Sequence, residues 1–125
     1  MKKIKVVCGV VRNEGKYLIT QRGDAKNFKK WEFPGGKVES NEDDFSSIKR
    51  ELLEELNLSI TPIKEVASYG FKSFQLVFIE CICLNSESIE LKEHLNYAWV
   101  HVNELAKFDF LEGDKKFIAH LITGK

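Results

Sequence analysis

No stretch of the sequence approaches the ~20 consecutive apolar residues that a membrane-spanning helix needs. We also expect no signal peptide at the N-terminus, because the apolar run 4–11 is short, Lys5 interrupts it, and no small-residue cleavage site follows. Net charge is absent too, since 19 lysines and arginines balance 19 aspartates and glutamates. We therefore expect a cytoplasmic protein that binds neither a membrane nor duplex nucleic acid, although a local positive pocket is still allowed.

Cysteine is scarce and odd in number: Cys8, Cys81 and Cys83 all lie inside hydrophobic stretches. A zinc site needs more ligands at wider spacing than Cys81 and Cys83 offer. We expect reduced thiols that pack as small apolar side chains in strands.

The chain also lacks internal repeats, low-complexity tracts and linkers, which predicts a single domain over residues 1–125. With 43% hydrophobic residues, it can bury a real core. The hydrophobic pattern predicts strands at 4–12, 16–22, 60–69, 74–84 and 97–102, a polar loop at 23–30, and a terminal amphipathic helix at 115–122. This order of strands and helices predicts a mixed α/β domain.

The clearest helix follows an aromatic segment and a Pro-Gly-Gly turn at 31–37. Ser40 or Asn41 is the expected N-cap, and acidic residues in the first turn suit the helix dipole. Apolar residues then recur at helical spacing and predict one buried stripe: Phe45, Ile48, Leu52 and Leu56. Asn57 can adopt the left-handed conformation that ends such a helix.

Three carboxylates, Glu51, Glu54 and Glu55, are spaced so that they share one helix face, within an arc of roughly 100°. Like charges at this spacing repel one another, and crowded carboxylates suit hard cations such as Mg²⁺ or Mn²⁺. The alternative is a solvated acidic face that pairs with Lys49 and Arg50.

A longer pattern surrounds these carboxylates and resembles the Nudix box. Its fixed positions are Gly36, Glu42, Arg50, Glu51, Leu52, Glu54, Glu55, Asn57 and Leu58. The one departure is Asn57, where the family pattern has glycine, and asparagine is the next-best residue for a left-handed helix end. The segment 31–37 is similar to the approach to this box in the MutT-like branch, which hydrolyses nucleoside triphosphates. The resemblance implies an α/β/α sandwich around a mixed β-sheet.

The resemblance also implies a metal site. Glu51, Glu54 and Glu55 would bind a divalent cation, Mg²⁺ or alternatively Mn²⁺, with the Gly35 carbonyl completing the site. Arg50 would orient these glutamates.

Two further glutamates have open roles. Glu93, in the loop before the last strand, matches a family glutamate that reaches the metal and can act as general base. It could equally be an ordinary exposed acid, and Glu51 or Glu54 could also serve as the base. Glu42 either helps through water or only stabilises the start of the helix.

Substrate contacts are implied less specifically. Arg22 resembles the arginine that contacts substrate in the MutT-like branch, and Lys37 can meet phosphate or simply be solvated. The other candidates for contact with the base are Phe33, Lys72, Phe78 and Asp114. Phe33 and Phe78 could equally be core aromatics, and Asp114 could instead cap the terminal helix. The three histidines lack metal-ligand spacing and are expected to be structural.

These roles imply hydrolysis of a nucleoside triphosphate to a nucleoside monophosphate and pyrophosphate, with an oxidised nucleotide such as 8-oxo-dGTP as the first expectation. A second hypothesis keeps the chemistry but changes the substrate to CTP, a modified pyrimidine nucleotide or another nucleoside diphosphate derivative. A third is a catalytically silent, nucleotide-sensing module. The expected partner is a small nucleotide, and the expected state is a monomer or a weak dimer.

Overall fold

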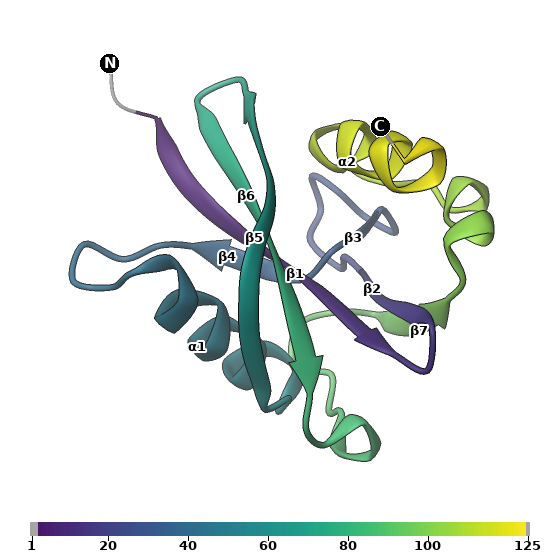
Figure 1. Ribbon diagram of the computed structural model, residues 1–125, viewed down its shortest axis with the longest axis horizontal. Helices are drawn as coiled ribbons and strands as arrows, with labels where there is room; N and C mark the ends of the chain where they lie inside the picture. The colour runs from purple at the N-terminus through teal and green to yellow at the C-terminus, as the bar shows by residue number, and fades with distance from the viewer. Residues whose placement is uncertain (1–2, 125) are drawn as a thin grey trace.

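The computed structural model describes residues 3–124. Within them, seven strands form one mixed sheet (Figure 1). The strands are β1 (Ile4–Asn13), β2 (Lys16–Gln21), β3 (Trp31–Glu32), β4 (Gly35–Lys37), β5 (Ile60–Phe71), β6 (Phe74–Cys83) and β7 (Asn96–Val100). The helices are α1 (Asp44–Leu56), α2 (Glu112–Thr123) and two short 3₁₀ helices, η1 (Ser86–Ser88) and η2 (Val102–Lys107).

The centre of the sheet is the parallel pair β1 and β6, in which Val7 lies opposite Val77. The strand order is β3-β2-β1-β6-β5, and β4 and β7 add to β1 and β2 respectively. Two hairpins, β1–β2 and β5–β6, account for much of the antiparallel pairing. β4 therefore brings the glycines of the Pro-Gly-Gly turn directly against the central strand.

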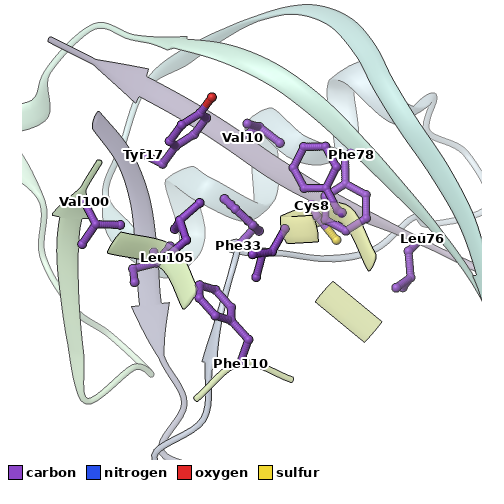
Figure 2. Packing of buried hydrophobic residues seen from close by; sticks show 12 residues of the cluster. Cys8, Val10, Tyr17, Phe33, Leu76, Phe78, Val100, Leu105 and Phe110 are labelled. Carbon is purple, nitrogen blue, oxygen red and sulfur yellow. The ribbon is translucent and has the colours of Figure 1, made fainter. Parts of the chain in front are cut away.

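One helix covers each face of this sheet. Because alternate residues of a strand point to opposite sides, the sheet contributes to two separate cores. Val7 and Val11 of β1 pack with Leu52 of α1, whereas Cys8 and Val10 belong to the second core with Phe117 of α2. This second core is rich in aromatic rings (Figure 2). The arrangement confirms the α/β/α sandwich around a mixed sheet.

The expected strands are confirmed, with ends shifted by up to two residues. The segment 31–37 differs from the expectation, because it is not only a turn: it contributes the short strands β3 and β4 on either side of Phe33 and Pro34. Cys8 and Cys81 are buried, and all three cysteines are free thiols. Among the described residues, no helix is long and apolar enough to cross a membrane.

Helix α1 begins later than expected. Its N-cap is Asp43, whose Oδ1 accepts a hydrogen bond from the amide of Ser46 at 2.7 Å, so neither Ser40 nor Asn41 caps it. Phe45 therefore lies in the first turn, where it is 39% exposed, and the expectation that it belongs to the buried stripe is wrong. The C-terminal end is confirmed, since Asn57 has φ 55° and its amide reaches back to the carbonyls of the last turn.

Helix α2 begins earlier than expected, at Glu112, and Leu111 is its N-cap. Asp114 thus lies inside the first turn with its side chain buried. The alternative in which Asp114 caps this helix is wrong, because its side chain bonds elsewhere.

Candidate active site

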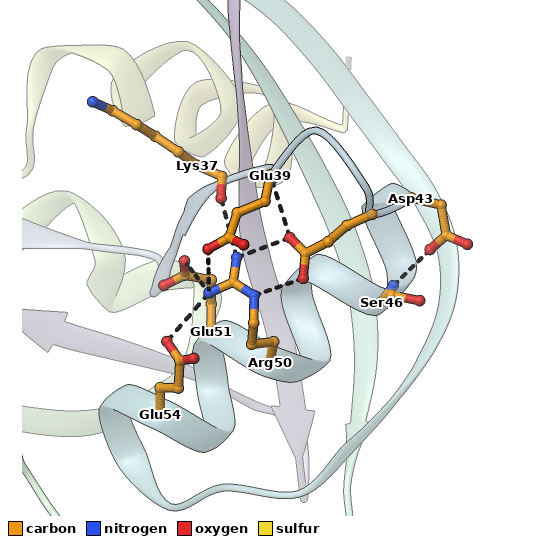
Figure 3. A network of polar contacts seen from close by, with 8 residues as sticks. Lys37, Glu39, Asp43, Ser46, Arg50, Glu51 and Glu54 are labelled. Carbon is orange, nitrogen blue, oxygen red and sulfur yellow. Dashed lines mark hydrogen bonds and ion pairs between the residues drawn. The ribbon is translucent and has the colours of Figure 1, made fainter.

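Arg50 of α1 is the centre of a network of carboxylates (Figure 3). Its Nε and Nη2 donate to the two oxygens of Glu42 at 2.6 and 2.9 Å. Its Nη1 donates to Glu51 at 3.0 Å and to Glu54 at 3.2 Å. One guanidinium thus forms charge-assisted hydrogen bonds with three carboxylates at once.

The pKa values of Glu42 and Glu51 in this network shift in opposite directions. The hydrogen bonds from Arg50 lower the pKa of Glu42 to about 2, and they raise the pKa of Arg50 itself. Burial raises the pKa of Glu51 despite the opposing charge of Arg50. Glu42 is therefore a firmly ionised partner of Arg50, whereas Glu51 is a carboxylate held partly out of water.

Glu55 of α1 has a carboxyl oxygen that no hydrogen bond within the described part of the chain satisfies. Its Oε1 is buried and has no hydrogen-bond partner among the described residues. Burial raises its pKa to about 9, and the negative charges of Glu51, Glu32 and Glu93 add to the rise. The ionised form of Glu55 is therefore costly beside these other carboxylates, and a bound cation would relieve that cost.

Within residues 3–124, no three histidine, cysteine, aspartate or glutamate side chains already converge as a preformed metal cage. Arg50 holds the carboxylates of Glu51 and Glu54 instead. The donor set nevertheless fits a divalent cation, because it is all oxygen and because the buried Oε1 of Glu55 lacks any other partner.

Two adjacent glycines allow the chain to lie close to β1 on one side and to α1 on the other. A Cβ atom at Gly35 would collide with the backbone of Val7, and one at Gly36 would collide with the carboxylate of Glu51. The Pro-Gly-Gly turn therefore requires glycine for reasons of space, and Gly36 leaves room for the Glu51 side chain.

A cavity of about 700 Å³ adjoins this network. Eight of the predicted site residues line it: Arg22, Phe33, Gly35, Lys37, Glu51, Glu55, Lys72 and Asp114. The cavity extends from the carboxylates of α1 to the β5–β6 hairpin tip and the start of α2. Its lining thus combines the acidic residues Glu51 and Glu55 of α1 with basic residues such as Arg22, Lys37 and Lys72.

The remaining predicted residues lie outside the lining. Arg50 contacts both Glu51 and Glu54 in the network, and Glu93 is exposed on its loop. Phe78 is fully buried and stacks on Phe117 with ring centroids 4.3 Å apart, which places it in the core rather than at the cavity.

Arg22 is held in place at the cavity wall by two carboxylates. Its Nε donates to Asp24 at 2.7 Å and its Nη1 donates to Glu32 at 3.1 Å. Partial burial alone would lower the pKa of Arg22, but these two bonds raise it above its ordinary value. The guanidinium is therefore a permanent positive charge in a fixed position.

Asp114 is a buried carboxyl group in the lining of the same cavity. Its Oδ2 accepts a hydrogen bond from the amide of Phe33 at 2.9 Å. Burial raises its pKa to about 8, against the effect of that hydrogen bond. The group is therefore poised to be either protonated or ionised near neutral pH.

Two polar residues were missed by the sequence reasoning. Glu32 was given no role and His94 was expected to be structural, yet His94 Nε2 lies 2.8 Å from Glu32 Oε2 and both side chains are nearly buried. The signal available for Glu32 was an acidic residue between two aromatic residues in segment 31–37. No local pattern links it to a histidine 62 positions away.

Comparison with known proteins gives the family. The model of the NUDIX domain matches residues 1–121. The chain belongs to the Nudix family. The Nudix box is thus the segment from Gly36 to Leu58, which carries the Arg50 network and Glu55.

Two curated Nudix relatives and one solved structure are informative. An 8-oxo-dGTP diphosphatase of Buchnera aphidicola is 35% identical over 113 residues, which cover 88% of this chain and 86% of the relative. A CTP pyrophosphohydrolase of Escherichia coli is 41% identical over 70 residues, covering 55% and 52%. The solution structure of the E. coli ORF135 protein superposes with a TM-score of 0.82 at 27% identity, covering 98% of this chain and 91% of that one.

Proposed function

We propose that the protein hydrolyses a nucleoside triphosphate to a nucleoside monophosphate and pyrophosphate, with Mg²⁺ as cofactor. The observation that supports this most strongly is the position of the Nudix-box carboxylates. Glu51 and Glu55 line a cavity of about 700 Å³ whose other walls carry Arg22, Lys37 and Lys72. Acidic and basic groups around one cavity suit a metal-bound polyphosphate.

The residues that would hold the metal are Glu51, Glu54 and Glu55 of α1, the carbonyl of Gly35, and Glu93. Mn²⁺ could replace Mg²⁺, because both prefer oxygen ligands. When bound, the cation would make an attacking water more acidic and offset the negative charge that grows on the phosphoryl oxygens.

The chain's own residues divide the remaining work. Arg50 orients Glu51 and Glu54 by its hydrogen bonds at 3.0 and 3.2 Å. Glu93 is our first choice for the base that takes the proton of the attacking water, since it is exposed whereas Arg50 holds the other two.

Positive charge for the polyphosphate comes from the cavity wall. Arg22 is fixed by Glu32 and Asp24, so it meets an anion without losing further side-chain entropy. Lys37 and Lys72 are exposed residues of the lining and can follow the phosphates as point charges.

The nucleobase of the substrate would lie toward Phe33 and Asp114. Asp114 Oδ2 is used by the amide of Phe33, which leaves Oδ1 as the oxygen for a ligand. An oxidised purine such as 8-oxo-dGTP is the first substrate class, by analogy with the Buchnera relative. CTP is the second, because an ionised Asp114 would accept a hydrogen bond from the cytosine amino group.

The test is a panel of nucleoside triphosphates with Mg²⁺ that includes 8-oxo-dGTP, dGTP and CTP, with kcat/KM measured by pyrophosphate release. We expect 8-oxo-dGTP to be turned over with the highest kcat/KM. A higher value for CTP would favour the pyrimidine substrate. If a nucleotide bound tightly but none was hydrolysed, the protein would be a nucleotide sensor rather than an enzyme.

A further inference from the structure

Glu32 joins two parts of the site through one buried carboxylate. Its Oε1 accepts from Arg22 Nη1 at 3.1 Å and its Oε2 lies 2.8 Å from His94 Nε2. The Glu32 side chain is 11% exposed and that of His94 is 6% exposed. A hydrogen bond to a carboxylate that is this well shielded from water is among the stronger polar contacts of a protein.

His94 has no comparable contact on its other side. Its Nδ1 is buried and lacks a hydrogen-bond partner among the described residues. Because a carboxylate only accepts, Nε2 is the protonated nitrogen in this contact and donates its hydrogen bond to Glu32. The bond to Glu32 is therefore the polar contact that fixes the imidazole ring.

His94 belongs to a short connection that has no helix or strand of its own, residues 91–95. Two backbone hydrogen bonds anchor this connection. The amide of Lys92 donates to the carbonyl of Glu55 at 3.2 Å, and the amide of Leu95 donates to that of Gln21 at 2.8 Å. Glu93 and His94 lie between these anchors. The side chain of Glu93 is exposed, whereas that of His94 is buried.

We infer that Glu32 and His94 are a positioning pair that fixes the connection 91–95, and with it the carboxylate of Glu93, against the Nudix-box helix. The catalytic part of this inference rests on the proposed function, in which Glu93 takes a proton or binds metal. The structural part does not, since it concerns only how the connection is held. Glu32 also accepts a hydrogen bond from Arg22. One carboxylate therefore holds both the connection 91–95 and the arginine that we propose binds substrate.

The structural part is tested by amide hydrogen exchange of the free protein, without metal or nucleotide. His94→Leu removes the donor and puts an apolar side chain of similar size in its place. We expect exchange at the Lys92 and Leu95 amides to accelerate at least about tenfold, with β1 and β6 unchanged. His94→Gln keeps an N–H donor on a long side chain and should restore most of the protection.

His101→Leu is the matched control, because His101 is exposed and its side chain caps no helix. It should leave exchange at Lys92 and Leu95 as in the wild type. If His94→Leu fails to fold, His94→Asn loses the same contact through a shorter polar side chain. Unchanged protection of Lys92 and Leu95 in whichever variant folds would overturn the positioning pair.

The catalytic part is tested by a double-mutant cycle with Glu93→Gln. His94→Leu alone should lower kcat about tenfold and leave KM nearly unchanged, because the loss acts through Glu93. In the Glu93→Gln background the same change should cost little more. Additive losses in the cycle would overturn the action through Glu93, whereas a wild type without activity would remove the proposed function and leave the exchange result standing.

Discussion

Asp114 Oδ2 lies 2.9 Å from the backbone nitrogen of Phe33 and accepts its hydrogen bond across 81 positions of sequence. This contact ties the first turn of α2 to the residue that precedes the Pro-Gly-Gly turn. It also places a buried carboxyl group in the wall of the cavity. Asp114 therefore joins a structural role to a candidate role in substrate choice, and the two roles can be measured separately.

The first prediction concerns substrate choice at Asp114. The Asp114→Asn variant keeps an oxygen for the Phe33 amide but gives the base a permanent amide in place of a titrating carboxyl group. We expect the ratio of kcat/KM between 8-oxo-dGTP and CTP to change about 5- to 150-fold, as for a pairing worth ~1–3 kcal/mol. The same ratio in variant and wild type would show that Asp114 only holds Phe33.

The second prediction concerns the pH dependence of stability. Asp114 has a pKa of about 8 when folded, because it is buried, but an ordinary pKa of 3.8 when exposed. The folded protein thus keeps a proton that the unfolded chain releases, so the free energy of unfolding should fall as the pH rises from about 4 to about 8. Asp114→Asn should flatten this fall in urea unfolding curves.

Asp109→Asn serves as the control for that measurement, because the Asp109 side chain is 66% exposed. It should retain the slope of the wild type. An equally steep fall in Asp114→Asn would mean that the Asp114 carboxyl group does not hold a proton in the folded protein.

The third prediction concerns the buried carboxylate of Glu55. Glu55→Gln keeps the shape of the side chain and removes its charge, so turnover should fall at least ~100-fold. The fold should survive, because like-charge repulsion with Glu51 decreases. Steady-state kinetics and thermal unfolding check both points, with Glu87→Gln as an exposed control. Wild-type turnover in Glu55→Gln would show that the charge of Glu55 is not needed for the reaction.

The fourth prediction concerns the space beside Gly36. A methyl group there would overlap the carboxylate of Glu51, which can move because it is the end of a flexible side chain. Gly36→Ala should therefore fold, with a small loss of Tm, but lose most of its activity. At Gly35 the overlap is with the backbone of Val7, so Gly35→Ala should lose stability as well. The reverse order of stability in thermal unfolding would refute this division.

The parts of the fold that depend on local pattern could be predicted from the sequence. The end of α1 at Asn57 follows from one residue's tolerance of positive φ, and the shared face of Glu51, Glu54 and Glu55 follows from helical spacing. Phe45 was misplaced because periodicity does not show where the first turn begins.

Contacts between distant segments could not be predicted in this way. The pairing of Glu32 with His94 and that of Asp114 with Phe33 depend on how β3 and α2 pack, and no local spacing encodes it. The same is true of the cavity, which is walled by residues from β1, α1, the β5–β6 hairpin and α2.

In the proposed function, the Nudix-box carboxylates support the release of pyrophosphate from a nucleoside triphosphate. Phosphorus-31 NMR of the reaction with Mg²⁺ and the preferred nucleotide tests it most directly, because the spectrum identifies both products. We predict nucleoside monophosphate and pyrophosphate as the first products of the wild type, with neither formed at a comparable rate by Glu54→Gln. Orthophosphate and nucleoside diphosphate as first products, or equal pyrophosphate release by Glu54→Gln, would contradict the account.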